Sequence, residues 1–219
     1  MTLAAVLFDI DGTLVDSNFL HVDAWSRAFD GIARPVAAWR IHRSIGMDSD
    51  KLLDALIPDA SDNDRERASE LHSTHYGRNR SRLRPFARTR ELLGVLAERG
   101  VKVVLATSAP EDELESLRAT LRIENAIDVV TSSGDVGTAK PAPDIVEVAL
   151  ARAGTSAADA VMVGDTVWDV EAAKRAGVAC VGVRSGGVSE AELRAAGAVA
   201  VYDDVAHLVD NLESSPLAG

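Results

Sequence analysis

The chain has 219 residues but only one cysteine, and it lacks both a long apolar run and an excess of positive charge. Since Cys180 has no second cysteine to pair with, an internal disulfide is excluded, and its place in an apolar run predicts buried packing. No apolar stretch approaches the roughly 20 residues that cross a bilayer. No charged and then apolar leader with a cleavage site is found either. We therefore expect a soluble, cytoplasmic protein with no membrane partner.

The chain is acidic, with a formal net charge of −11. Such a charge repels the nucleic-acid backbone and argues against a nucleic-acid partner unless a local basic patch exists. Residues 77–90 are a candidate for such a patch because they hold six arginines. Two interpretations of this stretch remain open: a solvated helix face beside a linker, or a surface that collects phosphate.

With 47% hydrophobic residues the chain can build a substantial core. Short apolar runs predict a first strand that ends at Asp9 and later strands over 101–106, 126–131, 160–163, 178–183 and 198–202. Apolar residues at helical spacing predict helices over 88–99, 111–122, 143–153, 167–176, 189–196 and 205–212. This alternation indicates an α/β fold, a Rossmann-like doubly wound parallel sheet that is covered by helices on both faces.

The interval 16–85 has a different pattern. It contains no convincing strand and predicts helices near 17–30, 35–44, 48–57 and 62–82. We therefore expect an inserted α-helical cap domain over 16–85 and a core domain made of 1–15 and 86–219. Ser17 and Pro85 mark the expected hinges between the two.

The stretch 4–16 reads AAVLFDIDGTLVD, an apolar run that ends in two acids spaced one residue apart. We expect Asp9 and Asp11 to point to opposite sides of an extended backbone, so that one carboxylate and one main-chain carbonyl meet a metal while the second carboxylate has another role. Gly12 lets the backbone turn sharply, and Thr13 can tie that turn down through its hydroxyl. A plain Asp-Gly turn after a strand is the alternative.

Polar residues follow two further strands at their carboxyl ends, where ligands collect in an open α/β sheet. Thr107 and Ser108 could hold an anion there, although a serine just before a helix is also typical of a helix cap. Asp165 and Asp169 lie four residues apart at a strand-to-helix junction and can face one side. Helix capping is their alternative role and would explain one of them. Lys140 lies in a proline-containing loop, where a lysine is usually only solvated.

Four ordered segments, DIDGTLVD, LATS, AKPAPD and VGDTVWDVEAAKRAG, resemble the motifs of the haloacid dehalogenase superfamily of phosphohydrolases. The match in order and spacing covers the whole chain and includes the helical insert between the first two motifs. Within the superfamily, the chain is similar to the branch of phosphoglycolate phosphatases and β-phosphoglucomutases. The resemblance implies an Mg²⁺-dependent phosphomonoesterase whose partner is a small phosphorylated metabolite.

The resemblance also implies catalytic roles for the first motif. Asp9 would attack phosphorus and become an aspartyl phosphate, while Asp11 would protonate the leaving oxygen and later activate water. The metal ligands would be the Asp9 carboxylate, the Asp11 main-chain carbonyl and Asp165, which suits a hard, oxygen-ligated cation. Because Asp11 must carry a proton when the alcohol leaves, we expect an environment that raises its pKa.

The remaining motifs would hold the phosphoryl group. The resemblance implies that Thr107, Ser108 and Lys140 bind the phosphoryl oxygens. Asp169 would orient Lys140 or a metal-bound water.

Two other functions remain open. A sugar phosphomutase is suggested by His21, ten residues after Asp11 as in β-phosphoglucomutases, although an exposed helix histidine fits equally well. Against a mutase, the cap loop 46–49 has serine where the mutase pattern has arginine, and Gly46 of this loop is a candidate substrate or cap residue. A binding scaffold without catalysis is the third function, which the full set of motif residues disfavours. Arg88 stands where relatives commonly have glycine, so it could alter hinge motion or reach the cleft.

Overall fold

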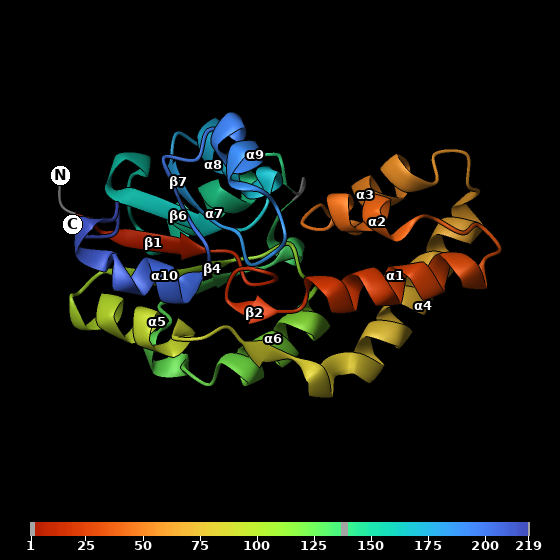
Figure 1. Cartoon of the computed structure of the whole chain (residues 1–219), viewed down its shortest axis with the longest axis horizontal. Coiled ribbons are helices and arrows are strands. Elements are labelled where there is room, and N and C mark those ends of the chain that lie inside the picture. Colours follow the sequence, from red (N-terminus) through yellow and green to blue (C-terminus); the bar gives the residue numbers. More distant parts are fainter. Residues whose placement is uncertain (1–2, 137–139, 219) are drawn as a thin grey trace.

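A computed structural model describes residues 3–136 and 140–218. At its centre lies a six-stranded parallel sheet (Figure 1). Its strands are β1 (Ala5–Phe8), β4 (Lys102–Ala106), β5 (Val129–Thr131), β6 (Ala160–Gly164), β7 (Ala179–Val183) and β8 (Ala200–Tyr202). The strand order is β5-β4-β1-β6-β7-β8, so β1 lies inside the sheet between β4 and β6. The parallel α/β fold predicted from the sequence is confirmed.

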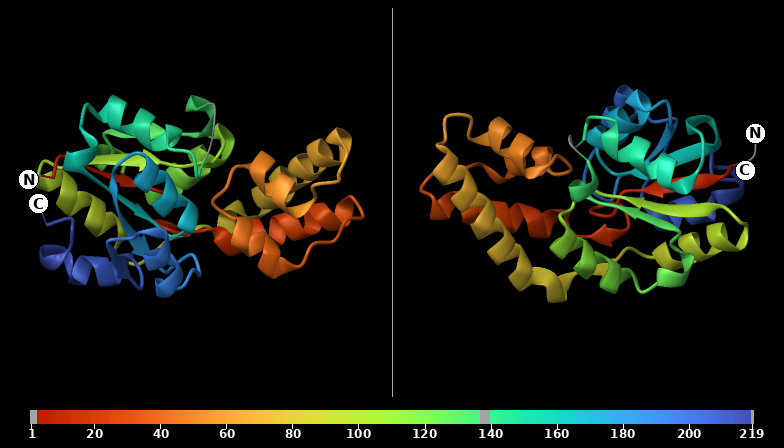
Figure 2. Two further views of the ribbon diagram at one scale, coloured as in Figure 1. Left: turned by 90° about the horizontal axis from the view of Figure 1, so that it is seen from above. Right: turned by 180° about the vertical axis from the view of Figure 1, so that it is seen from behind.

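Helices cover both faces of this sheet (Figures 1 and 2). One face carries α5 (Thr89–Glu98), α6 (Glu111–Leu121) and α10 (Val205–Asp210), and the other carries α7 (Asp144–Ala153), α8 (Val167–Arg175) and α9 (Glu190–Ala196). Strand β1 shows why two layers are needed. Val6 and Phe8 belong to the first apolar cluster, while Ala5 and Leu7 belong to the second. Since successive strand residues point to opposite faces, a strand that is apolar throughout must be buried on both.

The helical insert lies beside the sheet and is joined to it by two short strands (Figure 1). Between β2 (Val15–Asp16) and β3 (Arg84–Pro85), which pair antiparallel, the chain forms α1 (Asn18–Gly31), α2 (Ala38–Ser44), α3 (Ser49–Leu56), α4 (Asp62–Asn79) and the 3₁₀ turn η1 (Arg80–Arg82). The insert has an apolar cluster of its own, which includes Trp25, Phe29 and Leu53. We propose on this basis that residues 16–85 form the cap domain expected from the sequence.

The predicted boundaries differ from the observed ones by a few residues. The largest differences are of three residues: α2 starts at Ala38 rather than at residue 35, α4 ends at Asn79 rather than at residue 82, and β5 starts at Val129 rather than at residue 126. Residues Glu124–Ala126 form a 3₁₀ turn instead, and the Asp128 carboxylate accepts a hydrogen bond from the Val103 amide at 2.9 Å. Cys180 is buried on β7, as predicted. Within the two described ranges, no helix has the length and apolar character required to cross a membrane.

All six arginines of residues 77–90 are described, and all six are exposed. Four of them already make contacts within the chain. Arg80 pairs with Asp112, Arg88 pairs with Glu91 and Asp210, and Arg84 and Arg90 donate to main-chain carbonyls. The exposed positions fit the interpretation as a solvated surface beside the connection to the core.

Candidate active site

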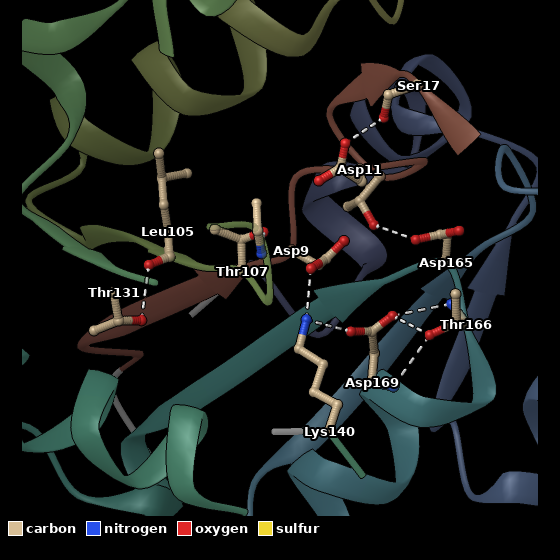
Figure 3. A network of polar contacts seen from close by, with 12 residues as sticks. Asp9, Asp11, Ser17, Leu105, Thr107, Thr131, Lys140, Asp165, Thr166 and Asp169 are labelled. Carbon is tan, nitrogen blue, oxygen red and sulfur yellow. Dashed lines mark hydrogen bonds and ion pairs between the residues drawn. The ribbon is translucent and has the colours of Figure 1, made fainter. Parts of the chain in front are cut away.

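Three acidic side chains meet at the carboxyl ends of β1 and β6 (Figure 3). Asp9 follows β1, Asp165 follows β6, and Asp169 lies one turn later in α8. Each offers a carboxylate oxygen that lies within 4.8 Å of the other two, and all three side chains are buried. Because β1 and β6 are neighbouring parallel strands, their ends deliver these residues to the same edge of the sheet. This arrangement agrees with the expectation that polar residues at the ends of different strands, those of the first and fourth motifs, gather at one edge of the sheet.

Lys140 provides a positive charge among these carboxylates (Figure 3). Its Nζ lies 2.5 Å from Asp9 Oδ1 and 2.7 Å from Asp169 Oδ1, and the residue has no exposed surface. Burial alone would lower the pKa of the ammonium, but the charges of Asp169 and Asp9 outweigh burial and raise it. Lys140 is therefore a charged, fixed ammonium rather than a solvated loop lysine. Residues 137–139, which precede it in the third motif, lie outside the described residues.

Asp165 is held by donors from the first motif and from the start of α1. Thr13 Oγ1 donates to its Oδ1 at 2.9 Å, and Asn18 Nδ2 donates to its Oδ2 at 2.8 Å. Glycines make room for this carboxylate, since a Cβ atom on Gly186 would lie 1.6 Å from Oδ2 and one on Gly12 would lie 2.4 Å from it. Burial, together with the charges of the neighbouring carboxylates, raises the pKa of Asp165 well above its usual range.

Helix capping explains Asp169 but not Asp165. The N-cap of α8 is Thr166, whose hydroxyl accepts from the Asp169 amide at 3.3 Å. The Asp169 Oδ2 atom accepts in return from the Thr166 amide at 3.0 Å and from its hydroxyl at 2.6 Å. This capping box satisfies one carboxylate oxygen and leaves Oδ1 for the ion pair with Lys140.

Asp9 and Asp11 face different partners, but the reason is not an extended backbone, in which alternate side chains share a face. Strand β1 ends at Phe8, and the chain then turns through Gly12, whose φ is 75°. The Asp9 carboxylate meets Lys140, whereas Asp11 Oδ1 accepts from Ser17 Oγ at 2.6 Å. Burial raises the pKa of Asp9 to about 8, against the lowering effect of Lys140.

The expectation of a raised pKa for Asp11 is wrong for this structure. Burial would raise it, but the hydrogen bond and charge of His21 and the hydrogen bond from Ser17 outweigh burial, so that the pKa is lowered. The distance from His21 Nε2 to Asp11 Oδ1 is 3.3 Å. The pKa of His21 is raised because the contact with Asp11 outweighs burial. The two pKa shifts therefore favour a proton on the imidazole over one on the Asp11 carboxyl group.

His21 is buried, so the alternative of an exposed helix histidine is wrong. Its Nδ1 lies 3.1 Å from Nε2 of His72 on α4, and its ring stacks on Tyr76 with centroids 4.0 Å apart. His72 stacks in turn on Trp25, and its Nδ1 lies 3.9 Å from Glu113 Oε1. Contacts therefore run from Asp11 through two histidines of the insert to an acid in the first turn of α6.

Thr107 and Ser108 follow β4 and line a cavity together with Asp9 and Asp11. The Thr107 hydroxyl accepts from the Ala109 amide at 3.0 Å. The interpretation of Ser108 as a helix cap is wrong, because α6 has Pro110 as its N-cap and no side-chain cap hydrogen bond. The buried Ser108 Oγ has no hydrogen-bond partner within the described part of the chain.

The helical insert forms the other side of the cavity. Gly46 lines it with a φ of 95°, and a Cβ there would lie 3.0 Å from the side chain of Thr166. Close to this contact, His42 Nε2 lies 2.8 Å from the Gly186 carbonyl oxygen, and Arg43 pairs with Glu192 at 2.6 Å. The insert therefore touches the core beside the fourth motif.

Comparison with known proteins places this arrangement in a family. The model of the haloacid dehalogenase-like hydrolases matches residues 3–177. The chain is similar to a phosphoglycolate phosphatase of Rhodospirillum rubrum, with 32% identity over 94% of this chain and 89% of the relative. It is also similar to a phosphorylated carbohydrates phosphatase of Thermotoga maritima, with 32% identity over 80% of this chain and 82% of the relative. The crystal structure of a hydrolase from Pseudomonas syringae matches with a TM-score of 0.92 and 35% identity, over 96% of this chain and 98% of that one.

The chain belongs to the haloacid dehalogenase-like hydrolase family. This membership confirms the resemblance inferred from the four motifs. Haloacid dehalogenase-like hydrolases are enzymes, so a binding scaffold is disfavoured.

Sequence reasoning missed several residues of this hydrolase site. Asn18 carries a weak signal, because it follows Ser17 directly and begins α1 next to the first motif. Gly186 lies against Asp165 but belongs to a loop after β7 that no motif marked. His72 and Glu113 carry no signal in the sequence, since their approach depends on how the insert packs against α6.

Arg88 does not reach the cleft, which corrects one of the two roles left open for it. The residue precedes α5 in the left-handed conformation, with φ 63°. Its guanidinium pairs with Glu91 and with Asp210 of α10, and it is not part of the cavity lining. Glycine adopts such a left-handed backbone with less strain than arginine does.

Proposed function

We propose that this phosphatase hydrolyses phosphomonoesters of small metabolites with the aid of Mg²⁺ and by transfer of the phosphoryl group to Asp9. The observation that carries the proposal is the set of three buried carboxylates around one buried lysine, with Asp11 beside them at the floor of a cavity. Ordinary structural roles do not account for so many buried charges at one edge of a sheet.

The residues present fit a hard divalent cation. Asp9, Asp165 and Asp169 place oxygen ligands close together, and Lys140 balances only part of their charge. The raised pKa values of Asp9 and Asp165 express the same imbalance, which a cation would relieve. In our proposal Asp9, Asp165 and the Asp11 carbonyl hold Mg²⁺. When bound, the ion neutralises the approaching phosphate and the charge that develops on it.

The chain's own residues then divide the reaction into two steps. An Asp9 oxygen attacks phosphorus as the bond to the leaving alcohol breaks, and Asp11 gives that oxygen a proton. In the second step Asp11 takes a proton from water as the water attacks the aspartyl phosphate, which releases inorganic phosphate and restores Asp9. Lys140 and the hydroxyls of Thr107 and Ser108 would hold the other phosphoryl oxygens.

In this proposal His21 supplies the proton that Asp11 passes to the leaving group. The lowered pKa of Asp11 and the raised pKa of His21 favour a proton on the imidazole, whose Nε2 lies 3.3 Å from the Asp11 carboxylate. Transfer over this contact gives the protonated Asp11 that the leaving group requires. Ser17, which donates to the same oxygen, keeps the carboxylate oriented in both forms.

The mutase alternative has less support from the cavity. Ser49 lines the cavity at the position where the mutase pattern has arginine, so a second phosphate would lose that donor. Release of inorganic phosphate, compared with isomerisation of β-glucose 1-phosphate, distinguishes the two reactions.

The nucleophile is tested by Asp9→Asn. We expect turnover of p-nitrophenyl phosphate to fall by at least about a thousandfold, because the amide is a poor nucleophile. An unchanged circular dichroism spectrum would show that the fold is kept. Appreciable activity in the folded variant would contradict the assignment.

The metal is tested by stability rather than by activity. Mg²⁺ at about 100 times its dissociation constant should stabilise the folded chain by about 2.7 kcal/mol, which thermal unfolding measures. Asp165→Asn should lose this response, whereas Asp59→Asn, at an exposed position of the cap, should keep it. An equal Mg²⁺ response in all three proteins would refute the proposed metal site.

A further inference from the structure

The part of the cavity away from the sheet differs in chemistry from the part near Asp9. We call the lining by Asp9, Asp11, Thr107 and Ser108 the sheet end, and the lining by Ser49, Ser69, His72, Ser73 and Glu113 the cap end. The contacts from Asp11 through His21 and His72 to Glu113 run from the sheet end to the cap end. A phosphoryl group at Asp9 would therefore direct its leaving alcohol toward the cap end.

Glu113 is the unusual residue of the cap end. It is 4% exposed, and its carboxylate makes no hydrogen bond with any residue that the structure describes. The imidazole of His72, at 3.9 Å, is too distant for one. Burial raises the pKa of Glu113 to about 7, although the charge of His21 acts against this. A buried carboxyl group without a hydrogen-bond donor destabilises the fold, so its presence in a cavity points to a ligand that donates to it.

The cap end also excludes one kind of ligand. Among the described residues that line the cavity there is no lysine or arginine, and Lys140 is occupied by Asp9 and Asp169 beneath it. The imidazole of His21 also lines the cavity, but it is paired with Asp11. A carboxylate or a second phosphate on the leaving group would therefore face Glu113 without a free cation to pair with. The positive end of α6 gives little help, because its first turn carries Glu111 and Asp112 as well.

Neutral hydroxyl groups fit the same lining well. A substrate hydroxyl can donate to the Glu113 carboxylate and can exchange hydrogen bonds with the serines of the cap end. The carbon skeleton of a polyol can pack against Trp25 and Leu52, which line the cavity from the insert.

On the basis of the proposed function, we infer that the leaving group is an uncharged polyhydroxy alcohol, as in sugar or polyol phosphates. Glu113 accepts a hydrogen bond from one of its hydroxyl groups and rejects leaving groups that carry a carboxylate.

Two substrates that differ in one group test this inference directly. Glycerol 3-phosphate and 3-phosphoglycerate place a CH₂OH group and a carboxylate at the same position. We expect kcat/KM of the wild-type enzyme with Mg²⁺ to be at least about tenfold higher for glycerol 3-phosphate, because a buried acceptor discriminates against an unpaired anion. Equal values, or a preference for the carboxylate, would overturn the inference.

Glu113→Gln locates the source of the discrimination. The amide keeps an acceptor oxygen and removes the charge, so the ratio of the two kcat/KM values should fall by at least about threefold. Because both values come from one protein, a general loss of activity cancels in the ratio. Glu115→Gln, on the exposed side of the same helix, should leave the ratio unchanged. A ratio that Glu113→Gln does not change would overturn the role of this residue.

Failure of the proposed function would be visible separately. Phosphate release from p-nitrophenyl phosphate reports hydrolysis without using the hydroxyl contacts. If it is absent, calorimetric titration of Asp9→Asn with the same two phosphates still measures the preference of the cap end. Tighter binding of glycerol 3-phosphate would support the inference, and tighter or equal binding of 3-phosphoglycerate would refute it.

Discussion

The sheet end and the cap end of the cavity differ in how their buried charges are paired. At the sheet end, Lys140 lies between Asp9 and Asp169, and Asp165 receives two donors from neighbouring elements. At the cap end, the carboxyl group of Glu113 is as deeply buried but has no hydrogen-bonded partner in the described chain. The charges at the sheet end are paired within the protein, whereas the carboxylate at the cap end is left to pair with a ligand.

This difference has a consequence for stability. Removing a charge that is paired within the fold leaves its buried partner uncompensated, so the removal should be costly. A buried charge without a partner opposes folding, and removing it should stabilise the protein. Substitutions that delete one charge at each end should therefore shift stability in opposite directions.

The largest effect is expected for Lys140→Met at the sheet end. The side chain keeps a similar length, but Asp9 and Asp169 lose the ammonium between them. We expect the free energy of unfolding near pH 8 to fall by about 3–5 kcal/mol, the usual cost of breaking a buried ion pair on one side. Urea denaturation at that pH measures it.

Lys174→Met is the matched control, since Lys174 is exposed on α8. Its unfolding free energy should stay within about 0.5 kcal/mol of the wild type. Equal stability of the two variants would remove the contrast between the ends, because the pairing of Lys140 would then contribute nothing.

An effect of the opposite sign is expected for Glu113→Gln at the cap end. In the folded protein the pKa is raised from 4.5 to about 7, so the folded state holds its proton more tightly than the unfolded state. The wild type should then lose stability as the pH rises from about 4.5 to 7. The glutamine variant lacks this loss, so above pH 7 it should be more stable by up to about 3 kcal/mol.

Chemical denaturation at pH 5 and at pH 8 checks both the sign and the pH range. The advantage of Glu113→Gln should be larger at pH 8 than at pH 5, and Glu115→Gln should follow the wild type at both. A variant that is less stable than the wild type at pH 8 would show that Glu113 has a partner within the fold, and the contrast between the two ends would disappear.

The sheet end could be predicted from sequence because its geometry follows from local rules. Asp9 and Asp165 each follow an apolar run, and parallel strands bring such positions to one edge. Asp169 follows by helical spacing. The identity of Lys140 as a partner needed the family resemblance, since nothing in its loop indicates a buried position.

The cap end could not be predicted in the same way. His72 and Glu113 meet only because α4 of the insert packs close to the start of α6, forty-one residues later in the chain. The pKa of Asp11 was mispredicted for a related reason, because its direction is decided by His21, whose orientation depends on the packing of α1. Positions set by the packing of the insert therefore limit what the sequence can show about specificity.

The smallest effect is expected at Arg88, which lies outside both ends. Its φ of 63° strains any side chain, while its guanidinium forms exposed ion pairs with Glu91 and Asp210. Replacement by glycine relieves the strain but loses the pairs, so the melting temperature should change little. Replacement by alanine loses the pairs and keeps the strain, so Arg88→Gly should melt about 2–4 °C above Arg88→Ala.

Both variants should keep the wild-type kcat/KM, because Arg88 does not line the cavity. A change in kcat/KM with Arg88→Gly alone would instead mean that the left-handed residue before α5 restrains the motion of the insert, and that specificity depends on this hinge as well as on the cap end.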